Sequence, residues 1–249
     1  LPYDAPAFEI WQQAQPGGEI FMPWTYPPQF SFLTQLLSLV PVGLGYALFT
    51  GLTLAGLVWA LFRLAPANAI PALMLTLPAL VMNIRAGQNG FQTAFLFAIV
   101  FLCARNARPA KAGIALGLLA FKPHLGLGMG LVALMRGGVR MVMAAALVLI
   151  ASLALATWAY GPDIWTAFLT SVRDSGSFLR QGAYPMERMI SLFALLNSLG
   201  ISAAIALSLQ AVLALGLLGL IALALWHRWQ LSHLLALSVI AGLGVSPYG

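Results

Sequence analysis

The chain has 249 residues, of which 61% are hydrophobic and 7% are charged, and its formal net charge is +6. Ordinary soluble domains carry a charge at about a quarter of their positions, so the composition and a mean hydropathy of +0.92 exclude a soluble domain. The basic residues stand singly between apolar runs, which indicates membrane topology and not nucleic-acid binding. Long Leu, Ala and Val runs without barrel-like alternation predict an all-α polytopic membrane protein.

The N-terminal segment, residues 1–25, is polar enough to form an aqueous loop on a membrane surface. Tyr26-Pro27-Pro28 then opens an apolar stretch over residues 30–40. At 1.5 Å per residue this stretch is too short to cross about 30 Å of hydrocarbon. We therefore predict a shallow or re-entrant helix that is entered through a rigid diproline corner.

The rest of the chain alternates long and short apolar runs. Residues 42–64, 141–160 and 203–226 are long enough to span a bilayer, whereas the other runs are shorter: 70–84, 91–104, 112–121, 125–135, 190–199 and 231–245. We predict one transmembrane domain over residues 1–249, with extracytoplasmic loops at 1–25 and 161–189. The first residue is Leu1, and an apolar run lies close to the last one, so we expect the chain to be a piece of a longer protein.

Charge predicts the orientation of these segments. If the basic run 105–111 is cytoplasmic, counting the crossings puts the other helix-end arginines on the same side: Arg63, Arg136, Arg140 and Arg228. All six carboxylates then fall on the opposite face: Asp4, Glu9, Glu19, Asp163, Asp174 and Glu187. The motifs YPP (26–28), RAGQNG (85–90), FKPH (121–124) and SPY (246–248) also converge there, and they predict a polar vestibule lined by two cations.

Lys122 is the residue that most needs an explanation, because burying an ammonium in hydrocarbon costs about 3 kcal/mol or more. Pro123 interrupts the helix beside it. One interpretation is that Arg85 and Lys122 hold an anionic group from the membrane, such as a lipid phosphate. The alternative is that both side chains simply reach the membrane interface. His124 either shares this site or is an interfacial ring bonded to a carbonyl.

Amides and tyrosines complete the predicted substrate site. Gln88 and Asn89 either recognise hydroxyl groups or form a turn with interhelical hydrogen bonds. We assign Tyr26 and Tyr248 to the same site because they belong to the converging motifs. Asp4 is either a general base or a solvated loop acid. The three histidines lie far apart and there is one cysteine, so we expect no metal site.

The motifs occur in an order that resembles glycosyltransferase family 87. They are YPP, NIRAGQNGFQTAFL (83–96), AGIALGLLAFKPHLGL (112–127), YGPDIWTAFL (160–169) and SPYG (246–249). The resemblance implies a class-C glycosyltransferase-like helical bundle with short or re-entrant helices. It also implies an active site on the extracytoplasmic face of the cell membrane, for which we expect a bacterial inner membrane and a multi-pass protein.

The same resemblance implies an enzyme that moves a hexose, expected to be mannose, from a polyprenyl-phosphate sugar to an acceptor hydroxyl. The expected partners are this lipid donor, a glycan or glycolipid acceptor and membrane lipids, with no nucleotide, cofactor, metal or nucleic acid. The family's catalytic aspartate precedes a Tyr-Asp pair that Tyr3-Asp4 resembles, so we expect the base upstream of this piece. A polytopic transporter or lipid flippase is the alternative, since it would also contain broken helices and buried cations.

Overall fold

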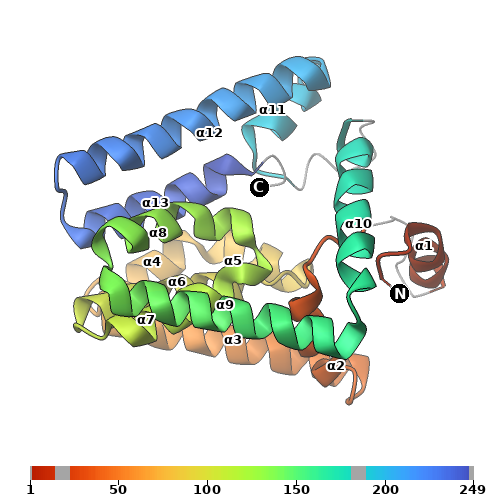
Figure 1. Cartoon of the computed structure of the whole chain (residues 1–249), viewed down its shortest axis with the longest axis horizontal. Helices are drawn as coiled ribbons and strands as arrows, with labels where there is room; N and C mark the ends of the chain where they lie inside the picture. The colour runs from red at the N-terminus through yellow and green to blue at the C-terminus, as the bar shows by residue number, and fades with distance from the viewer. Residues whose placement is uncertain (1, 15–22, 181–188, 247–249) are drawn as a thin grey trace.

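The computed structural model describes residues 2–14, 23–180 and 189–246 (Figure 1). These residues are mostly helical and contain no strand, which confirms the all-α fold. Three helices are long and apolar enough to cross a membrane, namely α3 (Val42–Leu64), α9 (Gly138–Tyr160) and α12 (Ala203–Trp226). At most 17% of their apolar windows is buried inside the protein. Most of their side chains therefore face outward, as lipid-exposed helices require.

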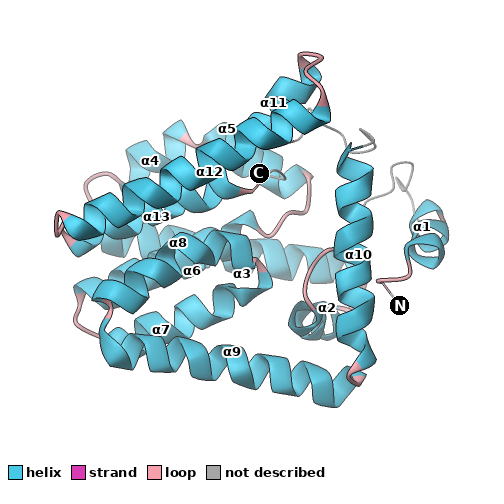
Figure 2. Cartoon of the chain, turned by 45° about the horizontal axis from the view of Figure 1, so that its top comes forward, coloured by secondary structure: helices cyan, strands magenta, loops and turns pink. Residues whose placement is uncertain are grey.

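Shorter helices fill the middle of the bundle. They are α6 (Gly90–Arg105), α7 (Pro109–Leu118) with the 3₁₀ turn η2 (Leu119–Phe121), α8 (Pro123–Arg136) and α13 (Leu231–Val245). In Figures 1 and 2, α12 and α13 lie on one side and α7 and α9 on the other, with α6 and α8 between them. The main core forms where these helices meet, around the fully buried Val100, Met129, Val132 and Leu234.

Glycines permit two of the closest helix contacts. A Cβ atom on Gly117 of α7 would lie 2.7 Å from Val148 Cβ of α9. A Cβ atom on Gly242 of α13 would lie 2.8 Å from the carbonyl oxygen of Leu125 in α8. Both distances are shorter than van der Waals contact, so these helices approach closely because the side chains are absent.

A buried amide fixes the C-terminal helices to one another. Gln210 of α12 is 3% exposed. Its Oε1 accepts a hydrogen bond from Phe193 N (3.0 Å) in α11 (Leu192–Ser198), and its Nε2 donates to Gly244 O (2.6 Å) in α13. One polar side chain in an apolar helix therefore satisfies backbone groups of two neighbouring helices.

The loops α3–α4, α6–α7, α8–α9 and α12–α13 gather at one end of the bundle, on the left in Figure 1. Arg105 donates to the carbonyl oxygens of Arg63 (2.7 Å) and Leu64 (2.8 Å) there. We call this the basic end, because these loops and the helix turns next to them hold the basic segments that the charge pattern assigned to one side. The YPP motif, the α5–α6 loop and the α7–α8 break lie toward the other end.

Two predicted segments differ from expectation in detail. Residues 70–84 form two helices, α4 (Ala69–Leu75) and α5 (Leu77–Arg85), because the chain breaks at Thr76 and Pro78 occupies the first turn of α5. The stretch 30–40 holds the 3₁₀ turn η1 (Pro28–Phe30) and the short helix α2 (Ser31–Leu37). This second segment is a short helix that cannot span, as predicted.

The two segments predicted as extracytoplasmic loops contain helices α1 (Ala5–Gln13) and α10 (Asp163–Arg180). In Figures 1 and 2, α10 runs across the direction of the long helices. Its buried positions recur at helical spacing and include Ile164, Ser171, Ser175 and Leu179. Its other face exposes Arg173 and other polar residues. We infer that α10 packs against the end of the bundle and does not cross the membrane.

Candidate functional site

Lys122 occupies the break between η2 and α8. Its backbone (φ −131°, ψ 74°) is not helical, in keeping with the disfavoured helical conformation of a residue before proline. The side chain is half-buried, and no described residue gives its ammonium group a hydrogen bond or an ion pair. No side chain caps the N-terminus of α8, and His124 lies within electrostatic range of Lys122. Positive charge beside an uncapped helix N-terminus is an arrangement that favours a bound anion.

A column of aromatic rings connects the YPP motif with Lys122. Trp24 lies 5.1 Å from Tyr26 between ring centroids, and Tyr26 stacks on Phe30 at 4.5 Å. Phe30 in turn stacks on Phe121 at 5.2 Å. We call these four rings, together with Lys122, the aromatic corner. Each pair contributes to stability beyond the area that it buries, so the corner holds two segments that are distant in sequence in fixed contact.

The N-terminal turn docks on this aromatic corner. The Tyr3 hydroxyl donates to the carbonyl oxygen of Tyr26 (2.6 Å), and its ring meets Phe168 of α10 edge-on at 5.9 Å. Burial raises the pKa of Tyr3 to about 12, so it remains a protonated donor at neutral pH. Ser171 of α10 donates to the carbonyl oxygen of Trp24 (2.8 Å). Helix α10 thus contacts the two N-terminal segments that hold Tyr3 and Trp24.

The turn between α5 and α6 is fixed by Asn83. Its Nδ2 donates to the carbonyl oxygen of Gln88 (3.1 Å), and its Oδ1 accepts from Gly90 N (3.1 Å). Tyr46 of α3 donates to the carbonyl oxygen of Ile84 just before the turn. Asn83 therefore satisfies an N-terminal amide of α6, a task that often falls to the N-cap residue itself.

Asn89 is the N-cap residue of α6, and its side chain makes no capping bond. It is 5% exposed and lies beside the hydroxyl of Tyr26. Burial raises the pKa of Tyr26, and the neighbouring Asn89 amide partly opposes this rise. The contact brings the turn 85–90 to the aromatic corner.

The predicted site residues are thus placed in two groups. The structure brings Tyr26, Asn89, Lys122 and His124 to the aromatic corner. Arg85 and Gln88 have exposed side chains without a polar partner among the described residues. Asp4 is exposed and caps α1 by accepting from Ala7 N (3.2 Å). Tyr248 lies outside the described residues, and the functional roles of all eight residues stay predictions.

Sequence reasoning missed several residues of this corner and of the adjoining turn and helix α6. Asn83 and Gln92 both lie within the motif NIRAGQNGFQTAFL, and an amide in an otherwise apolar stretch is the signal that marks them. Phe30 and Phe121 carry no such signal, because an apolar ring in an apolar run does not reveal its partner.

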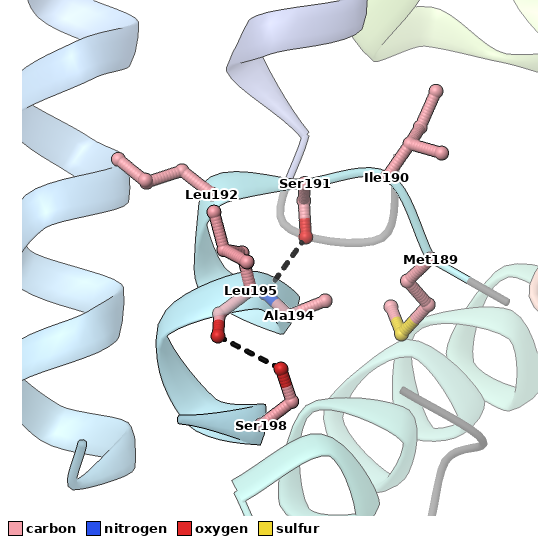
Figure 3. Close-up of a pocket in the computed structure, with 7 residues that line it drawn as sticks. All are labelled: Met189, Ile190, Ser191, Leu192, Ala194, Leu195 and Ser198. Carbon is pink, nitrogen blue, oxygen red and sulfur yellow. Dashed lines mark hydrogen bonds between the residues drawn. The ribbon is translucent and has the colours of Figure 1, made fainter. Parts of the chain in front are cut away.

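A hollow of about 470 Å³ lies away from the corner, against α11 (Figure 3). Its lining is mostly apolar, and its two serines bond to their own helix. Ser191 Oγ accepts from Ala194 N (3.1 Å) and Ser198 Oγ donates to Leu195 O (2.8 Å). No ionisable side chain of those that the structure describes lines this hollow. Among the described residues, no group of three or more His, Cys, Asp and Glu side chains is placed to hold a metal ion.

Comparison with known proteins gives one match. The sequence model of the family described as Glycosyltransferase family 87 matches residues 24–247, a range that includes the aromatic corner. No curated protein and no solved structure matches the chain.

Proposed function

The chain belongs to glycosyltransferase family 87, and from this premise we propose that it transfers a hexose from a polyprenyl-phosphate sugar to an acceptor hydroxyl. The proposed sugar is mannose, and the acceptor is a glycan or glycolipid on the extracytoplasmic side of a bacterial inner membrane. The protein crosses this membrane several times and needs no nucleotide, metal or cofactor. The family match supports a membrane glycosyltransferase and lends no support to a transporter or flippase.

The observation that carries the proposal is the unpaired Lys122 ammonium at the uncapped N-terminus of α8. A half-buried cation without a counter-ion is costly unless an anion joins it in the working state. A lipid phosphate supplies that anion, and its hydrocarbon tail stays in the bilayer. We assign His124 to the same phosphate, and we assign Arg85, at the end of α5, as the second cation.

The reaction needs a base as well as a phosphate site. The acceptor oxygen attacks the anomeric carbon, the bond from this carbon to the phosphate oxygen breaks, and the phosphate keeps the bonding electron pair. A carboxylate takes the acceptor proton, with inversion at the anomeric carbon. Asp4 is the candidate within this chain, one residue after the docked Tyr3. Charge on the phosphate grows in the transition state, so Lys122 should affect turnover as well as binding.

Replacement of Lys122 tests this assignment. In the full-length protein in membranes, Lys122→Ala should lower transfer from radiolabelled polyprenyl-phosphate mannose by about tenfold or more, the scale of one lost charge-stabilising contact. Lys111→Ala is the matched control, because Lys111 is exposed in α7 at the basic end. A folded Lys122→Ala protein with wild-type turnover would remove Lys122 from the mechanism.

A further inference from the structure

Three buried amide oxygens have no hydrogen-bond donor. They are Gln29 Oε1 in η1, Asn89 Oδ1 at the start of α6 and Gln92 Oε1 in the first turn of α6. Folded proteins leave few buried acceptors unpaired, because each one gives up its hydrogen bonds to water without a replacement. Such a group therefore needs an explanation.

Two of these oxygens belong to the same helical turn. Asn89 and Gln92 are three residues apart, so their side chains lie on neighbouring positions of one helix face. Neither is needed to cap α6, since Asn83 already bonds Gly90 N and Asn89 makes no side-chain cap. The side-chain oxygens of Asn89 and Gln92 thus make no hydrogen bond within the described residues.

The surroundings of this pair indicate what would bind it. Asn89 lies beside Tyr26, whose ring stacks on Phe30, and Phe30 stacks on Phe121 next to Lys122. A ligand at the pair would thus touch an aromatic ring on one side and have a cation within the same corner. Unpaired acceptor oxygens require a ligand that donates hydrogen bonds, and hydroxyl groups do so without adding charge.

We propose that Asn89 and Gln92 form the sugar subsite of the donor, with their amide oxygens accepting hydrogen bonds from hydroxyls of a neutral hexose. This inference rests on the proposed function, because it takes the lipid phosphate to lie at Lys122. Gln92 is then a binding residue for the sugar. The oxygens are covered in the structure described here, so binding of the sugar requires the groups that cover them to move aside.

The test compares a sugar-free lipid phosphate with the same lipid phosphate carrying a sugar. The purified full-length protein is titrated with a short-chain polyprenyl phosphate, and with the same lipid phosphate carrying mannose or glucose, and binding is followed by thermal shift. The wild type should bind one of the sugar-bearing lipids more tightly than the sugar-free lipid. Gln92→Leu should reduce this sugar-dependent gain by about fivefold, the scale of one hydrogen bond, and should leave binding of the sugar-free lipid unchanged.

Gln35→Leu is the matched control, because Gln35 Oε1 already accepts from the Tyr160 hydroxyl (2.9 Å) and its side chain is exposed. It should keep the full sugar-dependent gain. Gln92→Glu retains acceptor oxygens and should keep part of the gain. Gln92→Met, which is unbranched and lacks the acceptor, replaces Gln92→Leu if that variant does not fold.

The outcomes separate this inference from the proposed function. If the wild type does not bind the sugar-free lipid, or if Lys122→Ala binds it as well as the wild type does, the phosphate site is wrong. If Lys122→Ala loses this binding but Gln92→Leu keeps the full sugar-dependent gain, the sugar subsite alone is wrong. Equal loss for both lipids in Gln92→Leu would also overturn the subsite, because a purely structural role, such as holding a buried water, predicts that result.

Discussion

Asn83 bonds the turn before α6, so the N-cap residue Asn89 does not have to do so. Its side chain bonds both sides of the turn, to Gln88 O and to Gly90 N. The N-cap residue Asn89 is therefore not required to satisfy the first amides of α6 and can face Tyr26 instead. Asn83 thus fixes the turn, and Asn89 presents an amide to Tyr26. One asparagine could not perform both tasks.

This division predicts the effect of replacing Asn83. Asn83→Ala should cost about 0.5–2 kcal/mol of stability, the range for a lost N-cap, and should lower transfer because Asn89 loses its fixed position. Asn83→Asp keeps the acceptor for Gly90 N but loses the donor to Gln88 O, so its effect should be smaller. Thermal unfolding in detergent and transfer assays in membranes measure the two effects.

The control for Asn83 is Asn106→Ala, at the other end of α6. Asn106 is exposed and makes no side-chain hydrogen bond among the described residues. Its replacement should change stability by less than about 0.5 kcal/mol and leave transfer unchanged. An Asn83→Ala protein as stable and as active as Asn106→Ala would contradict the role of Asn83.

At the scale of helices, the close contact between α7 and α9 depends on a missing side chain. Gly117→Ala would place a methyl group 2.7 Å from Val148 Cβ and 2.8 Å from the carbonyl oxygen of Ala145. The helices must then separate or shift. Alanine also favours helix formation over glycine by about 1 kcal/mol, so the clash and the propensity act in opposite directions.

We predict that the clash wins at Gly117 and that Gly117→Ala destabilises the protein by about 1–3 kcal/mol, the usual cost of overpacking. Gly130→Ala in α8 is the matched change, because nothing lies within 4 Å of a Cβ atom placed there. That variant should be neutral or more stable. Thermal unfolding of both purified proteins measures the change in stability. If neither protein loses stability, α7 and α9 are not tightly packed.

Much of the helical pattern could be predicted from the sequence. The runs 42–64 and 203–226 coincide with spanning helices, and 141–160 falls inside a third, because length and hydropathy alone mark a span. The break at Thr76 was missed, since Pro78 stands in the first turn of a helix that the apolar run hides. The helix α10 lies within the segment 161–189, which the sequence predicts as an extracytoplasmic loop between membrane segments; an amphipathic helix is compatible with such a loop.

Within apolar runs, the residues of the candidate site could be predicted only where a polar residue interrupts the run. Lys122 and Asn89 meet this condition, and both lie at the aromatic corner. The stacking of Phe30 on Phe121 could not be predicted from the sequence, because hydrophobic periodicity does not indicate which distant apolar rings pair with each other. Gln210 is an intermediate case, since a lone amide in a 24-residue apolar helix signals a buried partner without identifying it.

For the molecule as a whole, the two ends of the bundle differ in chemistry. The basic end gathers the loops whose arginines lie between apolar helices, and Arg105 ties two of these helix ends together. The other end carries α1, α10 and the aromatic corner, together with the carboxylates Asp4, Asp163 and Asp174. Positive residues favour the cytoplasmic side of a membrane, so this asymmetry supports the proposed orientation, in which the aromatic corner lies on the extracytoplasmic side.

This orientation can be tested with single cysteines in the full-length protein, after removal of the others, including Cys103. Thr166 lies exposed on α10 and Lys111 lies exposed at the basic end. Thr166→Cys should react with a membrane-impermeant maleimide in intact cells, whereas Lys111→Cys should react only after the membrane is permeabilised. Retained transfer activity confirms that each variant is folded. The reverse labelling pattern would put Lys122 on the cytoplasmic side, where an extracytoplasmic lipid-linked sugar cannot reach it.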